Sequence, residues 1–396
     1  MAGVTPISDV PDAPTIGTAT AGAAGSGQAT VTYTAAATGG AVTTFTATST
    51  PGSVTGTGAS PITVSGLTLG TAYTFTVSGA NSTGTSPASA ASNSITATEI
   101  PKAGYIGGGN VGGFSQTSID KLIFSTDSRS ALSATLRGTN NQSAGFANSG
   151  TAGYFALANL NGNNTAAIDK IAFVTDTTSQ VSATRSGAHN NIGAMANSGT
   201  AGYIAGGTSA GISRTVIDKL AFSNDSISTL TATLSDGTNK PSGMANSGTA
   251  GYFGGGESTV ALSKIDKITF SNDTRTTLTP KLSNSVYNIG AAANSGTAGY
   301  FAGGAPSGIF ISTIDKITFS NDSKSTISAK LSLARWTLSG MANSGNKAYF
   351  CGGNDNSSSV SIIDKLTFSD ETVSSSGSTL SNNIRDTAAL ANSANL

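Results

Sequence analysis

The sequence predicts an all-β protein, a short sandwich followed by a repeated four-stranded unit, and three observations lead to this prediction. The chain holds 50 Gly among 396 residues, and only 10% of its residues are charged. Its Thr-rich segments contain few Glu and Lys residues, a composition that favours strands over helices. The apolar residues, 37% of the total, alternate with polar residues in the first part and recur at a fixed period in the rest.

The charge balance and the single cysteine argue against several classes of protein. With 20 basic and 20 acidic residues, no net field attracts nucleic acid or lipid, so we expect neither as a partner. Cys351 stands alone, so an intramolecular disulfide is impossible. The start, MAGVTPISDV, lacks the pattern of a signal peptide, and no apolar run is long enough to span a membrane. We therefore expect synthesis in a cytoplasm without a secretory signal.

The segment of residues 12–98 shows the period-2 alternation of half-buried strands. The stretches that carry this alternation are ATVTYT (29–34), VTTFTATS (42–49), PITVSGL (61–67) and AYTFTVSGAN (72–81). Clusters of Gly, Pro and Ser separate them at the spacing of a β-sandwich. The composition predicts an N-terminal arm at 1–11 and a linker at 99–104.

The stretch SGLTLGTAYTFTVSGANSTGTSPAS (65–89) resembles the E–F–G region of a fibronectin type III domain. Leu67 and Tyr73 match the Leu before the turn and the Tyr that opens strand F. Tyr33 stands where such domains usually carry a Trp on strand B. The resemblance implies a divergent fibronectin type III-like, Ig-like β-sandwich over residues 12–98.

Residues 105–396 contain one unit six times. A tyrosine before a Gly-rich tract recurs at steps of 48 or 49, at Tyr105, Tyr154, Tyr203, Tyr252, Tyr300 and Tyr349. The aspartate of an I-D-K phrase recurs in step, at Asp120, Asp169, Asp218, Asp266, Asp315 and Asp364. Such a period indicates a repeat architecture.

The pattern of each unit predicts four strands. They are a small-residue strand such as GMANSG, then AGYFAGG, then IDKITFSND, then a Leu-bearing strand such as TLTATLS (229–235). Four strands in about 49 residues is the content of one propeller blade, and propellers carry 4–8 blades. The period and the phrase YFAGG resemble kelch repeats. The resemblance implies a six-bladed kelch-like β-propeller over residues 105–396.

The two ends of the repeat region complement each other. The first unit begins at KAGYIGGG without the small-residue strand, and the chain's end, Thr387–Ser393 (TAALANS), supplies one. We expect the two to pair in one blade, so that the C-terminal strand closes the propeller without an exposed edge. The small residues also favour an innermost position for that strand.

Motifs that look catalytic have poor support. GGGNVG (107–112) matches G-x-G-x-x-G, but no helix follows it, and SIDK (118–121) matches S-x-x-K only by chance. His189 is the only histidine, which argues against a zinc site and against a histidine-based nucleophile. The six I-D-K aspartates repeat in every unit, so we expect them to accept backbone or cross-blade hydrogen bonds, with the lysines on the outer surface. We expect no enzyme activity, cofactor or metal, although a carboxylate pair for glycan hydrolysis stays open.

Two segments of the unit vary from repeat to repeat: one after the double glycine and one before the small-residue strand. The second holds residue types that are rare in this chain, namely His189, Lys240, Tyr287, Arg335 and Trp336. Loops on a rigid scaffold are where binding residues gather, and aromatic rings beside polar groups suit a sugar or a protein. We predict that this face binds a glycan or a protein. The alternative is that Trp336 and Tyr287 only pack between blades.

The whole chain, a Thr/Gly/Ala-rich sequence with a fibronectin-like module before these repeats, resembles virion structural proteins of tailed bacteriophages. The resemblance implies a tail-fibre or appendage component, located in the virion. Its N-terminal domain would contact other virion proteins, and its propeller a host-surface glycan or protein. Three alternatives stay open: a capsid-decoration or collar protein, a glycan-processing propeller enzyme, and a bacterial surface adhesin.

Overall fold

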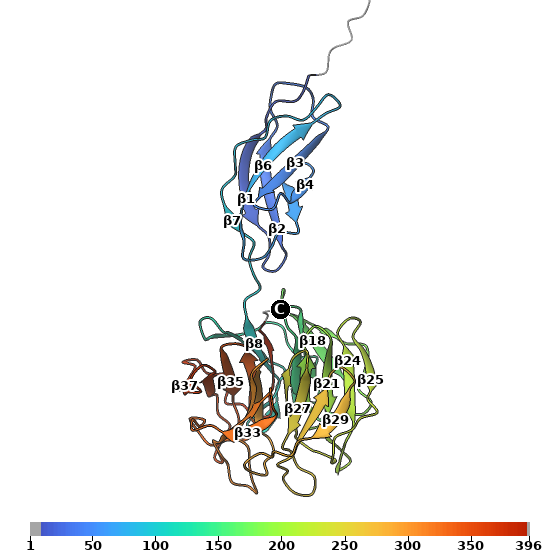
Figure 1. The fold of residues 1–396 in the computed structure, drawn as a ribbon, viewed down its shortest axis with the longest axis vertical. Helices are drawn as coiled ribbons and strands as arrows, with labels where there is room; N and C mark the ends of the chain where they lie inside the picture. The colour runs from blue at the N-terminus through green and yellow to red at the C-terminus, as the bar shows by residue number, and fades with distance from the viewer. Residues whose placement is uncertain (1–8, 394–396) are drawn as a thin grey trace, which may run out of the picture. The chain divides into compact units, whose positions relative to one another are not determined.

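The computed structural model describes residues 9–393, and every regular element in that range is a strand. The prediction of an all-β protein is therefore confirmed. The chain divides into two compact units, residues 1–100 and 101–396 (Figure 1). No helix within residues 9–393 has the length and apolar character needed to cross a membrane.

The first unit contains two antiparallel sheets, of order β1-β2-β5 and β4-β3-β6-β7. Their strands are β1 (Thr15–Ala21), β2 (Gln28–Thr34), β3 (Thr44–Thr50), β4 (Thr55–Thr57), β5 (Ile62–Ser65), β6 (Ala72–Ala80) and β7 (Ile95–Thr96). The four stretches predicted as strands correspond to β2, β3, β5 and β6. Alternate side chains of both sheets form one apolar core, because successive side chains of a strand point to opposite faces.

Two tyrosines of this unit have specific partners. The backbone N–H of Thr68 donates a hydrogen bond to the hydroxyl of buried Tyr73 at 3.0 Å. Tyr33 packs against Phe45, with ring centroids 4.4 Å apart, and donates to the carbonyl of Gly58.

The predicted N-terminal arm needs a correction at its end. Residues 1–8 lie outside the described residues, but Pro11 forms a β-bridge with Gly39. The side-chain amide of Asn81 also donates to the carbonyl of Asp9 at 2.8 Å. These bonds make residues 9–11 part of the first unit.

Three serines, spaced three residues apart, line the free edge of β6 without forming a regular strand. The backbone N–H groups of Ser86, Ser89 and Ser92 donate to β6 carbonyls at 2.7–2.9 Å. Each serine hydroxyl accepts an N–H of the same β6 residue at 2.9–3.0 Å. Every third residue faces β6, which is the period of an extended polyproline-like segment. The backbone groups at this edge of β6 are thereby hydrogen-bonded. The period-2 alternation in the sequence did not predict this segment, because its period is three.

The second unit contains six four-stranded antiparallel sheets (Figure 1). The first has the order β12-β11-β8-β38, and its strands are β8 (Ala103–Gly107), β11 (Ile119–Ile123), β12 (Ser128–Ala131) and β38 (Ala388–Asn392). In the other five the spatial order follows the chain. Their strands are β14 (Ala144–Asn148), β15 (Ala152–Ala156), β18 (Ile168–Ala172) and β19 (Thr177–Gln180); β20 (Gly193–Asn197), β21 (Ala201–Ala205), β24 (Ile217–Ala221) and β25 (Ser226–Thr229); β26 (Ser242–Asn246), β27 (Ala250–Gly254), β28 (Ile265–Thr269) and β29 (Thr274–Thr277); β30 (Gly290–Asn294), β31 (Ala298–Ala302), β32 (Ile314–Thr318) and β33 (Ser323–Thr326); β34 (Ser339–Asn343), β35 (Lys347–Cys351), β36 (Ile363–Thr367) and β37 (Val373–Ser375).

Short two-residue strands occur in the variable segments of the first three repeats. They are β9 (Asn110–Val111), β10 (Phe114–Ser115), β13 (Asn140–Asn141), β16 (Asn159–Leu160), β17 (Asn163–Asn164), β22 (Thr208–Ser209) and β23 (Ile212–Ser213).

The fourth strand of each sheet starts earlier than predicted. The stretch TLTATLS (229–235) was expected to be a strand, but β25 ends at Thr229. The turn after β24 is short, with Asp225 in the left-handed conformation at φ 54°, so the chain already pairs from Ser226 onward. Leu230 and Leu234 follow the strand and pack in the core instead.

The C-terminal strand pairs with the first strand of the repeat region, as the sequence predicts. In the β38–β8 ladder Leu390 lies opposite Tyr105 and Asn392 lies opposite Ala103. The small-residue strands also contact one another in sequence: β14 with β20, β20 with β26, β26 with β30, β30 with β34, β34 with β38, and β38 with β14.

The repeated phrase A-N-S-G supplies hydrogen bonds between these neighbouring strands. The N–H of Gly199 donates to the side-chain oxygen of Asn148 at 2.9 Å, and the N–H of Ser149 donates to the hydroxyl of Ser198 at 2.9 Å. Equivalent Gly-to-Asn bonds join 150 to 392, 248 to 197, 296 to 246 and 345 to 294. The phrase recurs because each copy bonds to the next sheet.

Glycine and alanine alternate at one position of the six small-residue strands. The position holds Gly145, Ala194, Gly243, Ala291, Gly340 and Ala389. A Cβ on any of the three glycines would lie 2.3–2.4 Å from the carbonyl oxygen of the preceding alanine in this cycle. Glycine is therefore required on every second sheet for the strands to approach this closely.

We predict that Gly243→Ala destabilises the second unit by about 1–3 kcal/mol, because its new methyl group meets backbone atoms that must move. Thermal and denaturant unfolding measure this loss. The matched control is Ala194→Gly, which introduces no close contact and costs only about 0.5–1 kcal/mol in backbone entropy. Equal losses for the two variants would contradict the steric explanation.

Candidate functional site

Neighbouring sheets of the second unit are joined by a repeated set of three side chains, which we call the Tyr–Lys–acid clamp. In one copy Tyr154 on β15 and Lys170 on β18 both bind Asp225 of the next sheet, each at 2.7 Å. The tyrosine–lysine–acid sets are Tyr105, Lys121 and Asp176; Tyr154, Lys170 and Asp225; Tyr203, Lys219 and Asp273; Tyr252, Lys267 and Asp322; Tyr300, Lys316 and Glu371; Tyr349, Lys365 and Asp127.

The geometry of the clamp corrects the expected place of the I-D-K lysines. Their side chains are 12–28% exposed and ion-paired at 2.5–2.7 Å, rather than spread over the outer surface. In four clamps the ammonium also lies over the tyrosine ring, 5.2–5.6 Å from its centroid. All six acids have φ between 53° and 56°, which the turn phrases around Asn and Asp accommodate.

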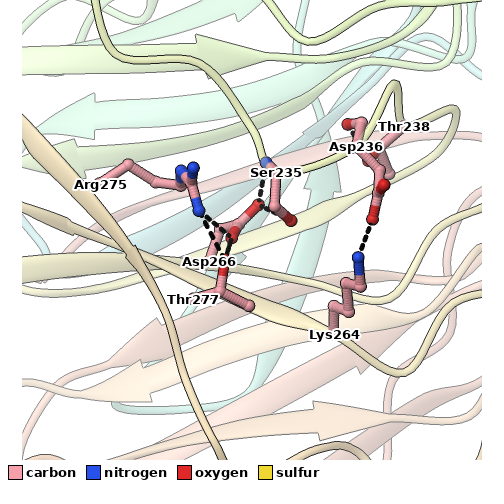
Figure 2. A network of polar contacts seen from close by, with 7 residues as sticks. All are labelled: Ser235, Asp236, Thr238, Lys264, Asp266, Arg275 and Thr277. Carbon is pink, nitrogen blue, oxygen red and sulfur yellow. Dashed lines mark hydrogen bonds and ion pairs between the residues drawn. The ribbon is translucent and has the colours of Figure 1, made fainter.

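The six I-D-K aspartates, each directly before a clamp lysine on the same strand, join the sheets a second time. Asp266 accepts the N–H of Ser235 at 2.8 Å and the hydroxyls of Ser235 and Thr277, with Arg275 at 3.7 Å (Figure 2). The corresponding N–H donors and aspartates are Ser381 to Asp120, Arg137 to Asp169, Ser186 to Asp218, Ser235 to Asp266, Ser283 to Asp315 and Ser332 to Asp364. Each N–H comes from the loop of the preceding sheet, so these carboxylates have a structural role.

Arg335, one of the five residues assigned to the binding face, is enclosed in the core. Its side chain and that of Asp364 are both 0% exposed, and they form an ion pair at 2.8 Å. The guanidinium also donates to the carbonyls of Gly352 and Phe350. These partners occupy Arg335, and we leave it out of the candidate site.

We expect Asp364→Asn to destabilise the second unit by about 3–5 kcal/mol, because the buried Arg335 would lose its counter-charge. Urea unfolding gives the value. Asp120→Asn is the matched control: Asp120 accepts the equivalent N–H, but its arginine, Arg129, is 3.6 Å away and 27% exposed. A loss at Asp364 no larger than at Asp120 would argue against this role of the pair.

His189 lies apart from the other predicted site residues. Its half-buried ring has a lowered pKa, first because of burial and then because of the charges of Arg185 and Arg214. Among residues 9–393 it makes no ring or polar contact with Lys240, Tyr287 or Trp336. The sequence analysis grouped His189 with these residues because it lies in the equivalent variable segment, but the structure does not bring it into their cluster.

Lys240, Tyr287 and Trp336 do come together, from three successive repeats. The Lys240 ammonium lies 5.0 Å from the Tyr287 ring centroid and 5.8 Å from that of Trp336. The two rings meet edge to face at 5.8 Å, and Phe310 stacks on Trp336 at 5.3 Å. We call these four residues the aromatic–lysine cluster.

Phe310 was not among the predicted site residues, although it belongs to the other variable segment. β-bridges such as Tyr287 to Ala305 and Trp336 to Asn354 place the two variable segments side by side. Phe310 was not predicted because the sequence of neither segment indicates that the two loops pair.

A cavity of about 110 Å³ adjoins the cluster and is lined by segments of all six repeats. Its rim consists of one equivalent residue from each repeat, with φ of 53–59°: Gln142, Asn191, Lys240, Asn288, Thr337 and Asp386. The N–H of Lys240 donates to the Asn191 carbonyl at 2.8 Å, and similar bonds join 337 to 288, 386 to 337 and 142 to 386. The backbone thus holds the rim, which leaves its six side chains free to differ.

The charges near the cavity are few. Burial raises the pKa of Asp386, against the opposing effects of Arg385 and Lys240. Burial also raises the pKa of Tyr287, and the charge of Glu257 adds to the increase. Within residues 9–393 no group of three His, Cys, Asp or Glu residues could hold a metal ion. Burial raises the pKa of Cys351 to about 12, so this enclosed sulfur remains a thiol near neutral pH.

Compared with protein-family models and with curated protein sequences, the chain matches none. The functional argument consequently rests on the chain's own residues.

The six clamp tyrosines predict a loss of stability at alkaline pH. Burial, followed by the neighbouring acid, raises their pKa values above the ordinary value of 10.0. The folded protein then keeps protons that the unfolded chain loses, so this stabilising contribution is intact below pH 10 and lost as the pH rises above it.

Unfolding free energies of the second unit between about pH 9 and 11 measure this effect. Tyr154→Phe keeps the ring and removes one titrating group, so its stability should fall less steeply with pH. Tyrosine absorbance that titrates near pH 10 while the fold stays intact would contradict the prediction.

Proposed function

We propose that this chain is a non-enzymatic structural protein of a tailed-bacteriophage virion, of the tail-fibre or appendage type, that contributes to adhesion to the host surface. In this proposal residues 105–396 form a six-bladed kelch-like β-propeller closed by β38. Residues 12–98 form a fibronectin type III-like sandwich that contacts other virion proteins.

Several features support this architecture. β38 completes the first four-stranded sheet, and the small-residue strands contact one another in a cycle from β14 to β38 and back. The Tyr–Lys–acid clamps follow the same cycle, since Tyr349 and Lys365 of the last repeat bind Asp127 of the first. In the first unit, the bond from Thr68 to the Tyr73 hydroxyl is similar to the tyrosine corner of immunoglobulin-like sandwiches.

The observation that carries the adhesive role is the aromatic–lysine cluster at the rim of the six-repeat cavity. The repeats are held by nearly identical bonds, whereas the variable segment before each small-residue strand lines this cavity. β-bridges such as Trp336 to Asn354 join that segment to the other variable segment. Variable loops on a rigid scaffold are the usual place of binding residues. Aromatic faces beside amides and hydroxyls suit a sugar surface, and no step of this proposal requires catalysis.

We predict that the purified chain adsorbs to host bacteria and that Tyr287→Ala combined with Trp336→Ala weakens adsorption at least about tenfold, because central aromatic contacts dominate such interfaces. A binding assay with fluorescently labelled protein gives the affinity. Val174→Ala, which truncates an exposed apolar residue after β18, is the control and should leave binding unchanged.

Immunogold labelling of purified virions with an antibody to the second unit tests the location. Label at the tail or its fibres supports the proposal. Label spread over the capsid would indicate a decoration role instead, and no label on the virions would overturn the proposal.

Unfolding curves of the Tyr287→Ala, Trp336→Ala double variant must show an intact fold for the adsorption result to count.

A further inference from the structure

The six clamps show which group this chain places beside a neighbouring lysine and tyrosine, and in four of them the lysine lies over the tyrosine ring. In each clamp a carboxylate binds the lysine ammonium at 2.5–2.7 Å and accepts the tyrosine hydroxyl at 2.7–3.0 Å. The arrangement satisfies the cation and the phenol with one acid.

Lys240 and Tyr287 form the same pair without the acid. The ammonium lies over the ring at 5.0 Å, closer than in the four clamps with this contact, where the distance is 5.2–5.6 Å. Among the described residues, however, Lys240 makes no ion pair and the Tyr287 hydroxyl makes no hydrogen bond. The pair therefore has one unused cation and one unused phenol, both only partly buried.

We propose that the aromatic–lysine cluster binds the carboxylate of an acidic sugar, with Lys240 as its ion-pair partner and the Tyr287 hydroxyl as its hydrogen-bond donor. This inference rests on the proposed adhesive function and specifies its ligand. The bound carboxylate takes the place that Asp225 has between Lys170 and Tyr154.

The surroundings of the pair favour a sugar as the carrier of that carboxylate. The partly exposed rings of Trp336 and Phe310 offer an apolar surface of the kind on which sugar rings pack. The adjoining cavity adds the side chains of Asn191, Asn288 and Ser242, which can donate to or accept from sugar hydroxyls.

Two acids of the chain lie near the cluster and oppose an anionic ligand. Glu257 influences the Tyr287 phenol, and Asp386 interacts with both Lys240 and Arg385. Asp386 already has a cation 3.6 Å away in Arg385, whereas Glu257 has no ion pair within residues 9–393. Glu257 is therefore the group that competes with the ligand, and removing its charge should strengthen binding.

The test is calorimetric titration of the full chain with trigalacturonic acid and with its methyl ester, which has the same rings without the charge. We expect the acid to bind at least about tenfold more tightly than the ester, the difference of one charge-assisted contact. Lys240→Asn should abolish that preference. Asparagine stands at two equivalent rim positions, Asn191 and Asn288, so this variant keeps the left-handed backbone.

Three further variants separate the contributions. Tyr287→Phe should weaken binding of the acid severalfold and leave the ester unchanged, whereas Trp336→Ala should weaken both. Glu257→Gln should strengthen binding of the acid. Acid and ester of equal affinity, or an acid preference that survives Lys240→Asn, would overturn the inference.

The outcomes also distinguish the inference from the adhesive proposal. If the acid does not bind while Trp336-dependent adsorption to cells persists, the carboxylate inference falls and adhesion stands. If the acid binds but cells do not, the site stands without its adhesive role. Hexaglutamate that binds as tightly as the acid, through Lys240, would overturn the assignment to a sugar.

Discussion

The second unit depends on one interaction, the carboxylate that each sheet extends to the tyrosine and lysine of its neighbour. Only 10% of the chain's residues are charged. The clamp concentrates those charges where sheets meet, under stacked rings such as Tyr154 and Phe222. Each acid occupies a tight turn with positive φ, so the backbone of that turn fixes where its side chain begins.

The use of the same bonds in every repeat explains why the variable segments can vary. The clamps, the I-D-K aspartates and the A-N-S-G phrases all bond one sheet to the next, and the rim of the cavity is joined through backbone N–H and carbonyl groups. No rim side chain is needed for these bonds, so Gln142, Lys240 and Asp386 can stand at equivalent positions. The bonds that join the sheets thus use other atoms of the repeat than the rim side chains.

The sequence predicted the features that are local or periodic. Period-2 alternation located β2, β3, β5 and β6, and the incomplete phrase at the chain's end predicted the pairing of β38 with β8. It could not show that Ser86, Ser89 and Ser92 line an edge, because their period is three. It also grouped Arg335 with Trp336, although consecutive residues point in different directions, and it missed Phe310, which reaches Trp336 only through pairing of two loops.

Lys240 differs from the lysines of the six clamps in the charge that it contacts. Each clamp lysine makes an ion pair with a carboxylate, and Lys240 makes none within residues 9–393. A half-buried cation between two rings loses part of its hydration, and the ring faces return only part of that energy. The clamps show that this chain otherwise adds a carboxylate at that point. A lysine held in the same way, at the rim of a cavity and without its acid, is thus a position where an external carboxylate gains most.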